Sequence, residues 1–208
     1  MKELELLLPE IQTSGNLATM QLPEAETYNF WKFYNNRILT LDGEISDWDY
    51  NIVKNIINLN MNNQEDPIIL LVNSNGGLLD VTNSIIDAIN FSAAPVWTVN
   101  TGNALSGGCL VFLAGEKRFT TKNSWCMAHA GSGGFQGNYS ETKEATKVWE
   151  MQVKRMGEYI MERTGLDSKT YNKYKNKDWY LNADQQIEFG FATDKLESIN
   201  QLIRTEGE

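Results

Sequence analysis

The chain has 208 residues, of which 41% are hydrophobic, 11% aromatic and 22% charged. This composition predicts one folded domain with a sizeable core, and it excludes a chain that is disordered throughout. Eighteen Lys and Arg against 27 Asp and Glu leave a formal charge of −9, which is the wrong sign for neutralising phosphate backbones and disfavours nucleic acid as a partner.

Neither a membrane span nor a secretory signal is expected. The longest apolar run covers residues 109–114, far short of the roughly 20 residues that a spanning helix needs. The N-terminal sequence MKELELLLPE places acidic residues inside its only apolar stretch and lacks a small-residue cleavage site, so we expect a cytoplasmic protein. Cys109 and Cys126 lie in apolar contexts, which favours two buried free thiols over a disulfide.

The organised domain is expected to begin near residue 28. Residues 1–27 show no sustained hydrophobic period, and we interpret them as an N-terminal arm. Residues 37–45 then predict a short strand, and residues 47–59 predict a helix. The apolar residues expected on one face of this helix are Trp48, Ile52, Ile56 and Leu59.

Two strand–turn–helix units follow. The β-branched run 68–72 predicts a strand covered on both faces, and it ends in NSNGG before a helix over 78–91. A second strand over 96–99 runs into TGNALSGG and a buried helix that ends at Ala114. This order predicts an α/β fold with a parallel sheet, in which ligand sites lie beyond the carboxyl ends of the strands.

Short strands are expected over 118–121 and 125–129, and the glycine-rich sequence GSGGFQG leads from them into a long helix. Residues 142–163 carry an apolar stripe about 140° wide on this helix. At roughly 1.5 Å per residue the helix is over 30 Å long. Two interpretations stay open, because the stripe could reach a neighbouring subunit or pack entirely on the home sheet.

Ser106 and His129 are candidate catalytic residues. Ser106 lies among glycines at a strand-to-helix turn, as in a nucleophile elbow, although GNALSGG does not match the GxSxG spelling. The structural alternative is a helix N-cap. His129 is the only histidine in the chain and supplies a base near neutral pH, and its alternative is a hydrogen-bonded histidine at a strand end.

Asp178 is the candidate for the carboxylate that orients the histidine. It adjoins an aromatic and apolar cluster, where a carboxylate needs a partner. Its alternative is to cap a helix over 183–189, a role that Asp184 fills equally well.

In four ordered segments the chain resembles the Clp protease proteolytic subunit family (ClpP). The segments are NSNGG, GNALSGG, MAHAGSGGFQG and DWYLNADQQIEFGFATD, whose family counterparts look like NSPGG, GxAASMG, MIHQPxGGxxG and RDxxLSAxEAxxYGLID. The sequence RILTLDGEI also resembles the family's first strand, and the resemblance covers residues 28–197. It implies that residues 28–208 form one ClpP-like serine protease domain. The implied fold is of the ClpP/crotonase type, with a parallel β-sheet built from ββα repeats and a protruding strand-helix handle.

The resemblance also implies a function and a site. It implies an ATP-dependent serine endopeptidase with Ser106 as nucleophile, His129 as general base and then acid, and Asp178 as the orienting carboxylate. The amides of Gly77 and Gly107 would form the oxyanion hole. This chemistry needs no metal or cofactor.

The implied partners are other copies of the chain, an ATPase and polypeptides. Family members form homo-oligomeric stacked rings, with heptamers as the expected size, that receive unfolded polypeptides from an AAA+ unfoldase. Residues 1–27 would then be an axial segment. Ile69 and Leu71 replace aromatic residues of the family's ATPase-docking pocket, whereas Phe91 matches it.

Three departures from the family pattern motivate an alternative function. Asn75 replaces a proline beside the oxyanion glycines, Leu105 replaces an alanine before the serine, and Gly131 replaces a proline after the histidine. The main alternative is therefore a catalytically weak or inactive ClpP-like ring subunit. A phage maturation protease of related fold and an acyl-CoA enzyme of the crotonase group are the others.

Overall fold

A mostly parallel seven-stranded β-sheet organises the protein, which the computed structural model describes over residues 25–202. Five strands lie in the order β1-β2-β3-β4-β7, while β5 pairs parallel with the end of β3 and antiparallel with β6. The strands are β1 (Ile38–Ile45), β2 (Ile68–Gly77), β3 (Val96–Leu105), β4 (Lys117–Thr120), β5 (Trp125–Ala128), β6 (Trp179–Leu181) and β7 (Asp194–Lys195). The predicted α/β class with a parallel sheet is confirmed.

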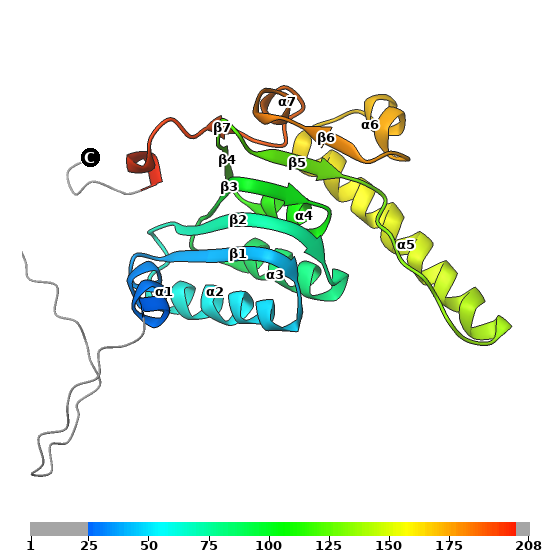
Figure 1. Cartoon of the computed structure of the whole chain (residues 1–208), viewed down its shortest axis with the longest axis horizontal. Helices are drawn as coiled ribbons and strands as arrows, with labels where there is room; N and C mark the ends of the chain where they lie inside the picture. The colour runs from blue at the N-terminus through cyan, green and yellow to red at the C-terminus, as the bar shows by residue number, and fades with distance from the viewer. Residues whose placement is uncertain (1–24, 203–208) are drawn as a thin grey trace, which may run out of the picture.

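Helices connect the strands, and one of them leaves the body of the molecule. They are α1 (Ala25–Asn35), α2 (Tyr50–Asn62), α3 (Leu79–Phe91), α4 (Gly107–Ala114), α5 (Tyr139–Thr164), α6 (Ser168–Tyr174) and α7 (Ala183–Glu188), with 3-10 helices at Asp47–Asp49 and Ile199–Leu202. Figure 1 shows α5 extending away from the sheet, with its N-terminal end at the far tip. Within residues 25–202, no helix has both the length and the apolar character that a bilayer span requires.

The main core lies between the sheet and helices α2 to α4. Helix α4 is buried at all of its positions, which explains why its sequence is apolar on every side. Alternate residues of β2 point to opposite faces of the sheet, so Ile68 and Leu70 join the main core. Ile69 joins Val99 and Phe119 in a smaller apolar cluster on the other face.

Strands β2 and β3 are longer than predicted. Their glycine-rich ends were expected to be turns, but β2 continues to Gly77 and β3 to Leu105. The strand pairing shifts register between Gly43 and Glu44 and again after Val72. Bulges of this kind absorb extra residues while the strand continues, a feature that composition alone does not distinguish from a turn.

Two of the differences from the predicted helices have a clear physical cause. Trp48 was expected on a buried face, but this is wrong: the residue is 82% exposed, because it lies in the 3-10 turn before α2. Helix α1 was not predicted. None of its residues is buried, so its sequence lacks the regular apolar spacing by which a packed helix is recognised. The N-terminal arm predicted for residues 1–27 lies almost wholly outside the described residues. The glycine-rich residues 131–137 form no helix or strand.

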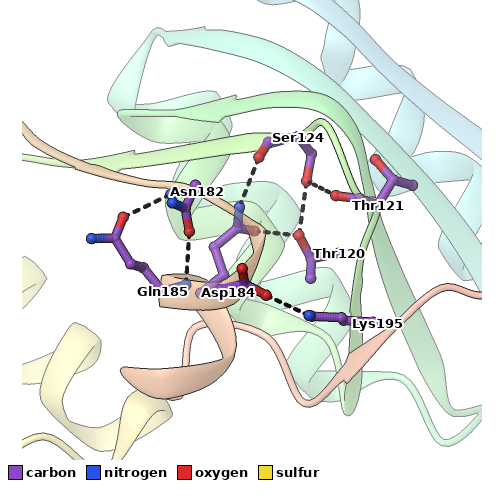
Figure 2. Close-up of polar contacts among 8 residues, drawn as sticks. Thr120, Thr121, Ser124, Asn182, Asp184, Gln185 and Lys195 are labelled. Carbon is purple, nitrogen blue, oxygen red and sulfur yellow. Dashed lines mark hydrogen bonds and ion pairs between the residues drawn. The ribbon is translucent and has the colours of Figure 1, made fainter.

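A buried glutamine joins the C-terminal elements to the sheet. Gln186 of α7 is fully buried, and its Oε1 accepts hydrogen bonds from Asn100 Nδ2 at 3.1 Å and Thr120 Oγ1 at 2.9 Å. Its Nε2 donates to the carbonyl oxygens of Ser124 and Leu181, both at 3.3 Å. Figure 2 shows Thr120 and Ser124 facing α7 in this network. The side chain thus fixes β6 and α7 against β3 and β4.

Replacing Gln186 with leucine is expected to lower the free energy of unfolding by about 3 kcal/mol, because four buried polar groups each lose a hydrogen bond. Gln136→Leu, on an exposed part of the chain, is the matched control and should change the free energy by less than about 0.5 kcal/mol. Urea unfolding followed by tryptophan fluorescence measures both variants. Equal stabilities would contradict the structural role given to Gln186.

Candidate active site

Ser106 stands at a strained junction between β3 and α4. Its backbone is left-handed, with φ 53° and ψ −120°, and its N–H donates to the carbonyl oxygen of Met127 at 2.8 Å. It occupies the N-cap position of α4, but its side chain makes no capping hydrogen bond. The N-cap alternative therefore does not explain the hydroxyl group, which points elsewhere.

The glycines around Ser106 are required by close packing. A Cβ atom on Gly107 would lie 2.7 Å from Thr82 Oγ1, and one on Gly108 would lie 2.8 Å from the carbonyl oxygen of Ser74. Both distances are too short for real contacts. The two glycines let α4 start directly against β2 and α3, which leaves the serine at the surface of the junction.

His129 follows the last residue of β5, and its ring reaches Ser106. The Ser106 Oγ and His129 Nε2 atoms are 2.7 Å apart, a normal hydrogen-bond distance. The His129 side chain is 18% exposed, so most of the imidazole is shielded from solvent. In this geometry Nε2 can accept the hydroxyl proton when the other ring nitrogen carries the N–H.

Asp178 lies opposite His129 because β5 and β6 are antiparallel. Ala128 pairs with Trp179, so the next residues outward on the two strands are His129 and Asp178. The His129 Nδ1 and Asp178 Oδ1 atoms are 3.4 Å apart, and the Asp178 side chain is 62% exposed. This distance is longer than a strong charge-assisted hydrogen bond, and solvent screens the pair. The contact between the Asp178 carboxylate and the His129 ring is therefore a weak one.

An aromatic cluster fixes the strand that carries Asp178. Trp179 is buried and stacks on Tyr174, with ring centroids 4.1 Å apart and planes within 8°. Phe189 and Phe191 pack edge-on against the same indole. The helix-capping alternatives for Asp178 and Asp184 are wrong, because the Asn182 side chain caps α7 through the Gln185 N–H.

The glycines at the end of β2 approach the start of α4. A Cβ on Gly76 would lie 2.7 Å from the Gly107 nitrogen and 2.7 Å from the Ser106 Cβ, and one on Gly107 would lie 3.5 Å from the Gly77 nitrogen. The Gly77 and Gly107 amides are thus neighbours beside the serine. Because Gly107 is the first residue of α4, its N–H has no hydrogen-bond acceptor within the helix. Two such N–H groups can stabilise a negative oxygen.

A cleft of about 560 Å³ opens beside these groups, and Ser106, His129, Gly77 and Gly107 all line it. The apolar part of its wall is formed by side chains of α3, α4, β5 and α5: Leu78, Leu79, Leu110, Met127, Trp149, Met156 and Ile160. Such a cleft offers apolar surface next to the Ser106 hydroxyl group. A second cavity of about 640 Å³ lies between α5 and α6 and contains none of the four polar groups.

The two cysteines do not contribute to this cleft. Cys109 and Cys126 are free and fully buried, with their sulfur atoms 3.1 Å apart. Burial raises the pKa of the Cys126 thiol, which disfavours the reactive thiolate. The prediction of two buried free thiols is confirmed.

Comparisons with known proteins place these motifs in a family. The family model for Clp protease matches residues 23–198. The "ATP-dependent Clp protease proteolytic subunit 2" of Treponema pallidum (strain Nichols) is 31% identical over 175 residues, which cover 83% of this chain and 88% of the relative. The protein of the same name from Treponema denticola is 32% identical over 165 residues, which cover 78% and 82%.

Gly76→Ala tests the close packing around Ser106. The new Cβ would collide with backbone atoms at a residue whose φ is +88°, so we expect a lower melting temperature and a rate of Ser106 modification by a fluorophosphonate reduced at least about 10-fold. Gly134→Ala is the control, because no atom lies within 4 Å of its Cβ position. An unchanged modification rate in Gly76→Ala would contradict the proximity of β2 to the serine.

Proposed function

This chain belongs to the Clp protease family, and we propose that it is a serine-type endopeptidase subunit of an ATP-dependent Clp complex. The family is one of peptidases, which supports hydrolysis of peptide bonds as the reaction. The observation that carries the serine mechanism is the 2.7 Å separation of Ser106 Oγ and His129 Nε2 beside two glycine amides.

The proposed reaction begins with attack of the Ser106 hydroxyl oxygen on a peptide carbonyl carbon. His129 Nε2 takes the hydroxyl proton, and the amides of Gly77 and Gly107 hold the oxyanion. When the C–N bond breaks, His129 returns the proton to the leaving amine, and an acyl-enzyme remains on Ser106. Water then attacks the ester with His129 again as base, which releases the new carboxylic acid and restores the serine.

Asp178 is the proposed orienting carboxylate. Acceptance of the Nδ1–H by its Oδ1 would hold the tautomer in which Nε2 is free to accept a proton. The 3.4 Å distance and the exposure of Asp178 are also the observations that favour a weakly active ring subunit as the second candidate. An acyl-CoA enzyme would not need the contact between Ser106 and His129.

We propose that the chain acts inside a chamber of stacked rings. Helix α5 extends beyond the sheet (Figure 1), and its outer half carries the exposed apolar side chains of Val148 and Met151. The relatives are named as proteolytic subunits of an ATP-dependent protease, which supports an AAA+ unfoldase that delivers unfolded polypeptides. Phe91, 85% exposed at the end of α3, is a candidate contact for that partner.

Gly131 departs from the family's proline in a way that has a structural cause. Its φ is +83°, a value that the proline ring cannot adopt, and the Trp149 indole lies against its Cβ position at 3.0 Å. The backbone after His129 therefore adopts a conformation that requires glycine at position 131. It leaves the contact between Ser106 and His129 intact, which supports an active subunit.

Labelling with a fluorophosphonate probe tests the proposed nucleophile and base. We expect the native chain to be labelled and Ser106→Ala and His129→Ala to lose at least about 1,000-fold in labelling or peptide hydrolysis. Asp178→Asn should lose less, about 10- to 100-fold, because the carboxylate is exposed. Asp184→Asn is the control and should keep full activity. An assembled native chain without labelling would favour the inactive-subunit alternative.

Sedimentation of the purified chain tests the ring. We expect a species many times the 23.6 kDa of one chain, and a smaller assembled fraction in Met151→Glu, since this substitution places a charge on the exposed apolar part of α5. Thr146→Glu on the same helix is the control. A native chain that sediments only as a monomer would exclude the chamber.

A further inference from the structure

We propose that Ser74 is a positioning residue for the oxyanion site and acts through Gly76 and Gly77. This inference rests on the proposed function and adds a residue to it. Ser74 lies inside the NSNGG segment of β2, and its side chain is only 1% exposed, so it does not contact a substrate. Its effect on the reaction must therefore pass through its neighbours.

The Ser74 hydroxyl group bridges both sides of a bulge. Its Oγ donates to the carbonyl oxygen of Gly43 on β1 at 2.6 Å and accepts the N–H of Gly76 at 3.1 Å. Gly43 pairs with Ser74, but the next residue of β1, Glu44, pairs with Gly76, so Asn75 is left out of the pairing. The hydroxyl group thus spans the point where the two strands change register.

The bulge determines where the Gly77 amide lies. Gly77 pairs with Ile45 two residues beyond the bulge, and the Gly77 Cβ position is in contact with the Ile45 backbone. Gly76 lies directly against the Gly107 nitrogen and the Ser106 side chain. A small rotation of the peptide between Asn75 and Gly76 would therefore displace the Gly77 N–H relative to the Gly107 N–H.

Ser74 is itself held from the other side by α4. The Cβ position of Gly108 lies 2.8 Å from the Ser74 carbonyl oxygen and 3.1 Å from its Cβ, so the first turn of α4 packs on this residue. The helix that follows Ser106 thus also packs against Ser74. Without the hydroxyl group, the buried Gly76 N–H loses its acceptor and the bulge loses its link to β1.

An oxyanion hole acts mainly in the transition state, so loss of its geometry should lower kcat and leave KM nearly unchanged. Removal of one donor of such a site costs about 100- to 1,000-fold in kcat, and a displaced donor should cost part of this. For Ser74→Ala in the assembled full-length chain we expect kcat on a short fluorogenic peptide to fall at least about 10-fold. The affinity for a peptide aldehyde, whose adduct carries the oxyanion, should fall by a similar factor.

Ser124→Ala is the matched control. Ser124 is equally buried, at 1% exposure, and its hydroxyl group also makes two hydrogen bonds, with Thr120 Oγ1 at 2.8 Å and the Thr121 carbonyl oxygen at 2.9 Å. Figure 2 shows these contacts between β4 and β5, among residues that do not line the cleft. A purely structural loss should lower the melting temperature of both variants and leave kcat unchanged in both.

An unchanged kcat in Ser74→Ala, with an active native chain, would overturn this inference and leave the proposed function standing. A native chain that neither cleaves peptide nor reacts with a fluorophosphonate would contradict both. If Ser74→Ala does not assemble, Ser74→Cys replaces it, since the thiol keeps a weak donor and acceptor. Its kcat should then fall with KM unchanged, and equality of its kcat with that of the native chain would overturn the inference.

Discussion

The left-handed backbone of Ser106 is the constraint on which the site depends. A non-glycine residue in this conformation costs on the order of 1 kcal/mol or more and persists only where its surroundings enforce it. Here the end of β3 is held between β2 and β5, and the Ser106 N–H is tied to β5 through the Met127 carbonyl. In this conformation the hydroxyl group faces His129 and does not cap the helix. His129 directly follows β5, the same strand that accepts the Ser106 N–H. One hydrogen bond between the end of β3 and β5 thus couples the position of Ser106 to that of His129.

The members of the site differ in how firmly the chain holds them. Ser106 and the glycine amides are embedded among β2, β3 and the buried helix α4, whereas Asp178 lies directly before the three-residue strand β6. Gln186 and the stacked Trp179 anchor that strand from behind, but the carboxylate itself remains in solvent. The chain therefore holds Ser106, Gly77 and Gly107 more firmly than it holds Asp178.

The sequence was sufficient to predict the alternation of strands and helices, because the β-branched run 68–72 and the apolar spacing of 78–91 have distinct periods. It also nominated Ser106, His129 and Asp178, which the structure brings together, although their catalytic roles stay predictions. The bulge at Asn75 was not predictable, since glycine-rich strand ends and turns have the same composition. The exposure of Trp48 was not predictable either. Trp48 lies in a short 3-10 turn directly before α2, and the spacing of the apolar residues from Trp48 to Leu59 looks like that of one continuous helix. Ser74 gave no signal either, because the role proposed for it depends on a register shift between two strands.

Helix α5 buries only Gly157 and Ile160, both in the half that rests on the body of the protein. Its outer half has a capping box at Asn138 and Glu141 but no core of its own, and tertiary packing supplies most of a helix's stability. Trp149, which lines the cleft, belongs to this outer half. In the proposed ring, a neighbouring copy that covers this half of the helix would therefore also hold one wall of the cleft in place.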